Sequence, residues 1–482
     1  MKPEPNSPTE GQRSAALFDD LPVPAEGAAA PADAPQGRAR VQTAQRNQIE
    51  LRACDLDALL APGHAARTVW AFVQSLDLAP LYARIKAVEG RAGRAAIDPA
   101  ILVGLWLYAT IDGVGSAREL NRLCERDDAY RWLCGGVGVN YHSLADFRTE
   151  HAAWLDAQLT RSVAALLDRG LVQLNRVAQD GMRVRAHAKA ASFRRRDRLA
   201  RLLAEARAQV ERLKQELHDD PAASSRRQQA ARERAARERE QRLARALATL
   251  DELDKVQTKK GWTDKRKAAP PPDDEPPGSA PQPAQGKPAQ AERAPRVSTT
   301  DSQARVMKMA DGGFRPAFNA QLAVDADTQI IAALELTNAG TDMQQMAPMH
   351  TQLRNRYGRT PAQWLADGGF AKLEHITALS AAGTEPYVPV PASRNPTIDP
   401  HLPKDGDSAA VARWRARMGT ADAAEIYKAR AASVECANAQ LRRRGLHRFN
   451  VCGTVKARAI LLWHALAHNL MRVAALEAAA AH

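Results

Sequence analysis

The sequence lacks several features that would place it in other classes of protein. Its five cysteines form no Cys-x-x-Cys pair, so it offers no zinc cluster and favours reduced thiols. No apolar run reaches the roughly 18 residues of a membrane span. The first residues, MKPEPNSPTEGQRS, hold no apolar core of a secretory signal. These absences predict a soluble, cytoplasmic protein without a membrane partner.

Aromatic residues are also scarce, and negative charge is outweighed by positive charge. Aromatics make up 5% of the 482 residues, which argues against a base-stacking surface for RNA or single strands. Lys and Arg number 68 against 55 Asp and Glu, a net charge of +13. A chain this basic indicates a polyanionic partner, and nucleic acid is the first candidate. Many basic proteins bind no nucleic acid, so motifs must support that interpretation.

Composition and periodicity divide the chain into six parts. Ala- and Pro-rich segments mark a tail and a linker, apolar residues at helical spacing mark the helical parts, and alternating residues mark strands. We predict a disordered tail over 1–45, a helical N-terminal DNA-binding domain over 46–172, the first part of an α/β catalytic domain over 173–190, a basic helical hairpin (coiled coil) over 191–257, a Pro-rich linker over 258–300 and the remainder of the α/β domain over 301–478.

Two of these parts leave their roles open. The N-terminal helices, among them one with a capping box in SARELNRLC, either contain a helix-turn-helix or form a bundle that binds no DNA. In the second arm of the hairpin, residues 226–245 hold eight arginines against three glutamates. Such a run is either a solvated helix face or an arm that follows phosphates, and the hairpin could also form a dimer interface.

The pentapeptide ADGGF occurs twice, with Asp311 in the first copy and Asp367 in the second. Asp311 precedes a strand among Gly, Pro and Arg, where turn chemistry explains it. Asp367 follows QWLA, at the carboxyl end of a predicted strand, and ligands of open α/β sheets bind at that edge. We therefore predict that Asp367 is the functional aspartate.

A catalytic magnesium ion needs further oxygen ligands. Asp180, in the strand VAQDGMRV, and Glu435, on a C-terminal helix, are the candidates. At 100° per residue, the polar residues of that helix share an arc of about 140°, together with the apolar Val434 and Leu441. This arc predicts a face that rests on the sheet. Its polar members are Tyr427, Arg430, Glu435, Asn438 and Arg442.

Four segments then carry a family resemblance. They are DGVGSARELNRLC with YRWLCGG and HSLADFR; QDGMRVRAHA; GGFRPAFNAQLAVD with QWLADGGF; and YKARAASVECANAQLRRRGLHRF. In this order they resemble the DDE transposases of bacterial insertion sequences, most closely the insertion sequence 1182 branch near the group with a Y-x2-R…E-x6-K signature. With HALAHNL, the resemblance covers about residues 51–473 apart from the insertion. It implies an RNase H-like α/β catalytic domain after an all-α N-terminal domain.

The resemblance also implies the site. Asp180, Asp367 and Glu435 become the metal-binding triad for two Mg²⁺ ions, with Mn²⁺ as a substitute. Two departures from the family pattern are Arg442 in place of a lysine and Met182 in place of a threonine. From the signature and the surrounding positive charge, we expect DNA contacts from Tyr427, Arg430, Asn438, Arg442, Arg443 and Arg448.

The predicted function is DNA cleavage and strand transfer at insertion-sequence ends by two-metal phosphoryl transfer. The partners would be terminal inverted repeats, target DNA and further copies of the chain in a synaptic complex at the nucleoid. The alternatives are a DNA-binding protein that kept the fold without catalysis, and a structural coiled-coil protein, which fits residues 191–257 alone.

Two further pairs of residues have open roles. His464 and His468 have the spacing of a zinc pair, but no third ligand is evident and core packing is the simpler interpretation. Asn319 and Gln321 share one face of their strand, where they either line the site or are half-exposed polar residues.

Overall fold

The computed structural model describes residues 55–88, 90, 95–219, 225–267, 295–393 and 395–480. The predicted tail over 1–45 and most of the predicted linker over 258–300 lie outside these residues.

The N-terminal part is helical, as its apolar spacing predicts. Asp98 caps α3, whose first residue is Pro99, and the Ser116 hydroxyl accepts the backbone N–H of Glu119 in the predicted capping box. The helices are α1 (Ala65–Ser75), α2 (Ala79–Tyr82), α3 (Pro99–Ile111), α4 (Ala117–Arg126), α5 (Asp128–Cys134), α6 (Tyr141–Glu150) and α7 (Ala152–Asp168).

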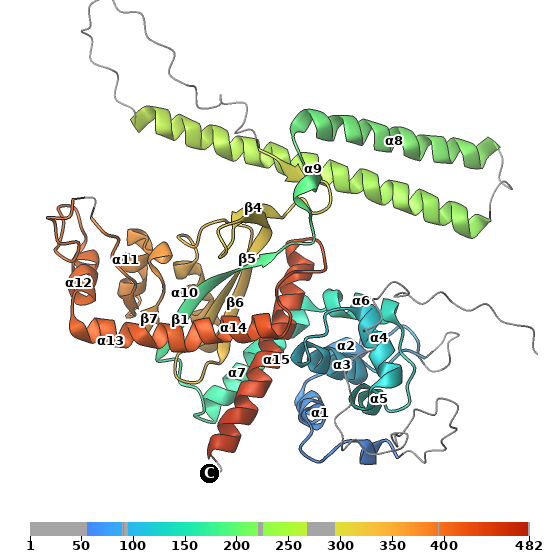
Figure 1. Cartoon of the computed structure of the whole chain (residues 1–482), viewed down its shortest axis with the longest axis horizontal. Helices are drawn as coiled ribbons and strands as arrows, with labels where there is room; N and C mark the ends of the chain where they lie inside the picture. The colour runs from blue at the N-terminus through green and yellow to red at the C-terminus, as the bar shows by residue number, and fades with distance from the viewer. Residues whose placement is uncertain are drawn as a thin grey trace, which may run out of the picture. The chain divides into compact units, whose positions relative to one another are not determined.

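A mixed six-stranded sheet comes next in the chain (Figure 1). The central strand β1 pairs antiparallel with β5 and parallel with β7, which pairs parallel with β8. Along the other edge of β5, β4 pairs with its first residues and β6 with the later ones. The strands are β1 (Arg176–Arg185), β4 (Arg305–Lys308), β5 (Phe314–Asp325), β6 (Ile331–Thr337), β7 (Gln363–Leu365) and β8 (Glu385–Tyr387).

Helices surround this sheet. Helix α10 contacts β6, and α11 contacts β8. Helices α13 and α14 cross one face of the sheet (Figure 1). Their bounds, in chain order, are α10 (Met346–Tyr357), α11 (Leu373–Ala381), α12 (Ala409–Met418), α13 (Ala421–Arg430), α14 (Cys436–Arg443) and α15 (Thr454–Ala480).

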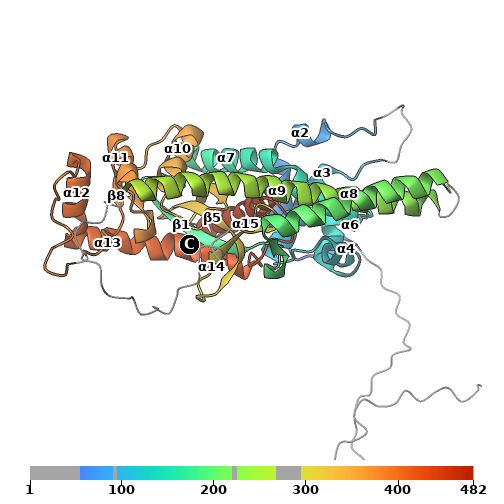
Figure 2. The same ribbon diagram turned by 90° about the horizontal axis from the view of Figure 1, so that it is seen from above.

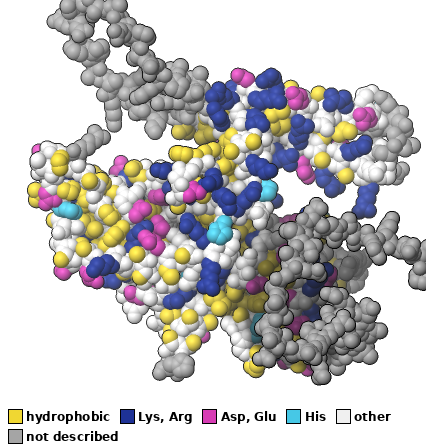
Figure 3. All heavy atoms as spheres, in the orientation of Figure 1, with side chains coloured by type: hydrophobic (Ala, Val, Ile, Leu, Met, Phe, Trp, Pro, Cys, Tyr) yellow, Lys and Arg dark blue, Asp and Glu magenta, His cyan; other side chains and the backbone are white. Residues whose placement is uncertain are grey.

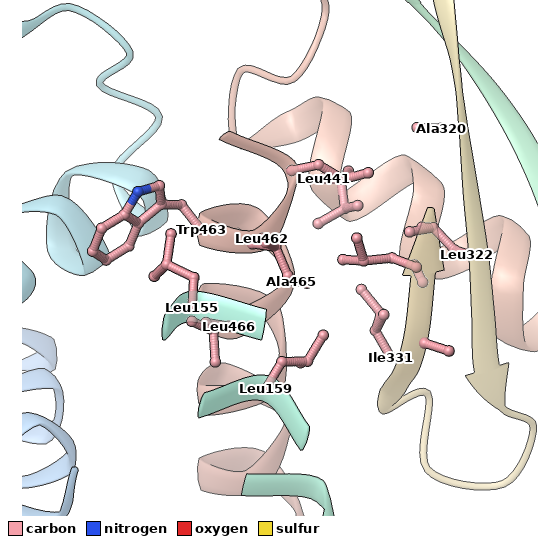
Figure 4. Close-up of a cluster of buried hydrophobic side chains, with 14 of the residues drawn as sticks. Leu155, Leu159, Ala320, Leu322, Ile331, Leu441, Leu462, Trp463, Ala465 and Leu466 are labelled. Atoms are coloured by element: carbon pink, nitrogen blue, oxygen red, sulfur yellow. The ribbon is translucent and has the colours of Figure 1, made fainter. Parts of the chain in front are cut away.

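The last helix, α15, joins the N-terminal helices to the sheet. Figure 4 shows Leu462 and Leu466 of α15 in one cluster with Leu159 of α7 and Ile331 of β6. Removal of such side chains from water is the main favourable term in this packing, at roughly 1.5–3 kcal/mol for each fully buried leucine. By length and composition α15 could cross a membrane, but 67% of its apolar window is buried inside the protein. A buried core helix passes the same test, so this is weak evidence for a membrane span.

The insertion between β1 and β4 forms a helical hairpin. Helix α9 (Arg226–Lys267) runs beside α8 (Arg196–Asp219) and extends past it (Figures 1 and 2). Helix α9 therefore continues past the predicted boundary at residue 257 and into the predicted linker. At its base, β2 (Phe193–Arg194) pairs with β3 (Val297–Ser298).

Candidate active site

Two predicted aspartates lie side by side on the sheet. Strands β1 and β7 are parallel, and Ala178 pairs with Leu365. Side chains alternate along a strand, so Asp180 and Asp367, each two residues further on, share one face. Burial is the main cause that raises the pKa of Asp180, and the negative charge of Asp367 adds to it. Residues far apart in the chain therefore meet through strand register.

Asp367 lies where β7 ends and the chain turns. Its carboxylate accepts the backbone N–H of Gly369 at 2.8 Å and caps the short helix η4 (Gly368–Phe370). The carboxyl end of β7 beside β1 is the edge at which ligands of open α/β sheets bind. Asp311, in the first ADGGF copy, lies instead in the turn between β4 and β5.

The third acid, Glu435, reaches the site on an irregular helix. One continuous helix with 100° per residue is wrong for this stretch, because Ala431–Glu435 form a π-helical turn between α13 and α14. A π turn fits an extra residue into the helix and changes the direction of the helical turns after it. Val434 and Leu441 are fully buried, as predicted, so the face still rests on the sheet.

The Arg430 guanidinium connects two of the acids. Its Nη2 donates to Asp180 Oδ1 at 2.9 Å, and its Nη1 donates to Glu435 Oε1 at 2.6 Å. Asn438 Nδ2 donates to the other oxygen of Asp180 at 2.7 Å. Glu435 is therefore paired with Arg430, and through this arginine it is linked to Asp180.

Charge and burial compete at this cluster. Burial raises the pKa of Asp180, while the nearby Arg430 charge and the Gly181 N–H lower it in part. Burial by itself lowers the pKa of Arg430, yet that pKa is raised overall by the surrounding acidic groups. In order of effect these groups are Asp180, Tyr427, Asp367 and Glu435. The charges of all three acids thus act on one cation, which bonds to two of them.

The donors at this cluster fit Mg²⁺ in kind, because Mg²⁺ takes oxygen ligands from carboxylates. In addition, the Asn438 Oδ1 atom is buried beside Asp180 with no hydrogen-bond partner. Within the described ranges, no group of three acidic, histidine or cysteine side chains is close enough to form a finished metal site. The guanidinium of Arg430 stands between two of the carboxylates where a metal cation would be expected.

The other residues expected to contact DNA lie around the same helices. Tyr427 is half-buried, and its pKa is raised by burial and by the charges of Asp367 and Glu435. Arg442 and Arg443 are on α14. Arg448 is exposed beyond α14, and its Nη2 donates to the His187 carbonyl oxygen near the end of β1. Their contacts with DNA stay a prediction.

Asn319 and Gln321 occupy the opposite face of the sheet. Gln321 pairs with Gly181, one residue beyond Asp180, so its side chain points away from the Asp180 carboxylate. Both are fully buried, which contradicts the half-exposed interpretation. The reason is Asp342, which accepts an N–H from each amide at 2.6 Å.

Asp342 is an acid that no sequence motif singled out. It lies in a loop after β6, pairs with Arg183 at 2.8 Å and is 12% exposed. A Cβ at Gly181 would clash with its Oδ1 atom, so glycine admits this close approach. Strand β1 continues through Gly181. Glycine inside a strand often marks such an approach and was the available signal.

Three further sequence-based residues lie in the core. Met182 is buried on the same face as Asp180, beside Ala320. His464 and His468 are buried in α15, and burial lowers their pKa to about 3 and about 4. The His468 Nε2 atom lies 2.8 Å from the Gln329 carbonyl oxygen. Core packing of both histidines is therefore confirmed.

Two family models match this chain. Residues 54–150 match the transposase domain DUF772, and residues 286–470 match the transposase DDE domain. No curated protein and no solved structure matches. The DDE match includes Asp367 and Glu435 but starts after Asp180, so the strand register links Asp180 to this domain.

Proposed function

This chain belongs to the DDE transposases of insertion sequences, and on that premise we propose that it cuts and rejoins DNA through Asp180, Asp367 and Glu435. The family implies an RNase H-like α/β domain with a mixed sheet and a DNA substrate. The observation that supports the proposal most is the register of β1 and β7, which brings Asp180 and Asp367 to one face beside Glu435.

In this proposal the three carboxylates hold two divalent ions. When bound, Mg²⁺ or Mn²⁺ would activate water or a 3′-hydroxyl and stabilise the leaving oxygen. The chain itself supplies the acids from β1, from the turn after β7 and from the π-helical turn before α14. Such a scaffold keeps the carboxylates in place with little reorganisation.

Arg430 has a positioning role in this proposal. In the absence of other cations, its guanidinium neutralises Asp180 and Glu435, which would otherwise repel each other in a partly buried site. With metal and DNA present, a planar guanidinium at this position suits a phosphate oxygen pair. Asn438 keeps the Asp180 carboxylate oriented through its N–H.

The remaining parts of the proposal concern assembly. Joining two element ends requires that both be held at once, so we propose that a homo-oligomer acts on the DNA. The helices α1–α7 are the candidate for recognition of the terminal repeats, and the match of residues 54–150, which hold α1–α6, to a transposase domain supports this.

The test is cleavage of DNA that carries the gene's native flanks. Full-length protein is incubated with Mg²⁺ or Mn²⁺, and nicks are mapped at single-nucleotide resolution. We expect nicks at the flanking repeats with wild type and none with Asp180→Asn or Glu435→Gln, each checked for folding by thermal melting. If folded wild type binds the repeats but never cuts with either metal, the catalytically inactive DNA-binding protein is correct instead.

A further inference from the structure

A groove lies between the inserted helix α9 and the catalytic domain. Its volume is about 1100 Å³. One wall is α9, with Arg239, Arg242 and Arg245, and the opposite wall consists of residues 299–303 and 452–453, with His187 also lining it. None of these residues belongs to the acidic cluster on β1 and β7.

The walls of the groove are held together by packing. Val297, directly before the second wall, is fully buried in an apolar cluster with Leu199 of α8 and Leu243 of α9. Arg196, at the start of α8, pairs with Asp251 and Asp254 of α9 at 2.5 and 2.7 Å. The hairpin is therefore packed against residues that lead straight into the catalytic sheet.

The three arginines form a strip along one side of α9. They are spaced three residues apart, so each step advances about 4.5 Å along the axis. All three line the groove. Within the described part of the chain, Arg242 and Arg245 form no ion pair, and the Arg239 Nη1 atom donates to the neutral Gln209 at 3.2 Å. The strip thus offers guanidinium groups that form no ion pair with any carboxylate among the described residues.

The acidic residues that line the groove do not neutralise the charge of these arginines. Asp301 is 3% exposed, and its two oxygens accept the backbone N–H groups of Gln303 and Gly453. Its carboxylate oxygens are therefore already bonded to backbone N–H groups of the wall. Glu252 lies about two helical turns beyond Arg245, the nearest arginine of the strip. The opposite wall adds the uncharged polar side chains Thr299, Thr300, Ser302 and Gln303.

The other side of the hairpin is different. A second hollow there, lined by both helices, has its cations paired: Arg207 with Glu240 at 3.4 Å, Lys214 with Glu211 at 2.7 Å, and Arg237 with Glu233. Lys and Arg cover much of the hairpin surface in Figure 3. The contrast in pairing, rather than the number of cations, singles out the first groove.

We propose that this groove binds the sugar–phosphate backbone of the duplex DNA on which the active site acts. Unpaired arginines opposite hydroxyl and amide groups are the set that contacts phosphate and sugar without reading sequence. A strip of three guanidiniums at this spacing would meet two or three phosphates. The inference rests on the proposed function for its ligand, but it concerns a surface outside the catalytic site.

The experiment measures how DNA affinity depends on salt. Full-length wild type and the triple variant Arg239→Gln, Arg242→Gln, Arg245→Gln are titrated against two duplexes, one with the native flank and one of unrelated sequence. Because each neutralised phosphate contributes a slope of about 0.9 in log K against log salt, we expect the slope to fall by about two to three. The affinity should fall by a similar factor for both duplexes.

Two further variants make the result specific. Arg227→Gln, Arg232→Gln, Arg234→Gln removes the same charge from residues nearer the start of α9 and should change the slope by less than about one. Arg239→Lys, Arg242→Lys, Arg245→Lys keeps the charge and should keep the slope. Equal loss in both glutamine triples, or an unchanged slope in the groove triple, would overturn the proposal. Loss for the native flank alone would also overturn it, because it would indicate base reading.

These outcomes separate the groove from catalysis. Suppose that wild type cuts DNA and the acid variants do not, while the triple glutamine variant of the groove keeps the salt slope of wild type. The proposed function then stands, and the proposal that the groove binds DNA is wrong. Suppose instead that no cutting occurs but the triple glutamine variant of the groove has the expected smaller salt slope. The proposal that the groove binds DNA then stands, and the catalytic proposal is wrong.

Discussion

The aspartates of the two ADGGF copies form the same local hydrogen bond but have different surroundings. Asp311 accepts the N–H of Gly313 at 3.0 Å, and Asp367 accepts the N–H of Gly369 at 2.8 Å. Asp311, however, lies exposed in a turn and pairs with Arg315, four residues along the chain. Asp367 lies on the sheet face that carries Asp180.

This comparison shows what a short motif can and cannot specify. Asp before two glycines favours a turn in which the carboxylate accepts an N–H two residues on, and both copies form it. The neighbours of that carboxylate depend on the strand before it. β7 pairs with β1, whereas the first copy connects two strands that pair with each other. Only the second copy therefore meets another part of the chain.

The largest expected difference concerns catalysis. Asp367→Asn should lower DNA cleavage at the flanking repeats by at least about a hundredfold, because it removes one of the carboxylates proposed to hold the divalent ions. Asp311→Asn should stay within about twofold of wild type, since it changes an exposed turn. Both are measured by nicking with Mg²⁺ or Mn²⁺. Loss of cutting with Asp311→Asn alone would reverse the assignment.

The next difference concerns the arginine beside each cluster. The Arg430–Asp180 pair is mostly buried, with side chains 10% and 17% exposed, and Arg430→Gln should lower the free energy of unfolding by about 3 kcal/mol. The Arg315–Asp311 pair is 43% and 58% exposed, so Arg315→Gln should cost less than about 1 kcal/mol. Urea unfolding measures both values.

Added Mg²⁺ provides a control for the first of these variants. If Arg430 stands where a metal cation binds, Mg²⁺ should raise the melting temperature of Arg430→Gln more than that of wild type. Equal losses of stability in Arg430→Gln and Arg315→Gln would show that burial does not distinguish the two arginine–aspartate pairs.

A smaller difference concerns the first glycine of each copy. Gly312 has φ = +79°, so Gly312→Ala should lower the free energy of unfolding by about 1 kcal/mol. A Cβ at Gly368 would meet Pro389 at 3.9 Å, an ordinary contact, and this glycine is not left-handed. Gly368→Ala should therefore change stability by no more than about 0.5 kcal/mol. Thermal melting of both variants checks the order, and a larger loss at Gly368 would contradict it.

The smallest expected effect is the titration of Asp311. Its hydrogen bond with Arg315, then that with the Gly313 N–H, lowers its pKa. A lowered pKa contributes stability above the ordinary aspartate pKa of about 3.9 and loses it as the pH falls. Carboxyl NMR should show a pKa below that value in wild type and a higher one in Arg315→Gln. An unchanged pKa in the variant would show that the pair does not persist in solution.

Much of the fold could be predicted from the sequence pattern. The strands around Asp180 and before Asp367 and the Ser116 cap all have local signals. The π turn before Glu435 has no such signal, since its residues are ordinary helix formers and one extra residue per turn depends on packing. Asp342 also escaped prediction, because its partners come from β1 and β5 and its own sequence resembles a helix start.

By itself, the sequence determined the elements whose hydrogen bonds span a few residues: the capped helices, the alternating strands and both Asp-Gly-Gly turns. The tertiary structure decided which carboxylates share a site. That choice depends on which faces of β1 and β7 are buried, and on the register in which the strands pair. Register is a property of two distant segments together, so identical pentapeptides could acquire different neighbours.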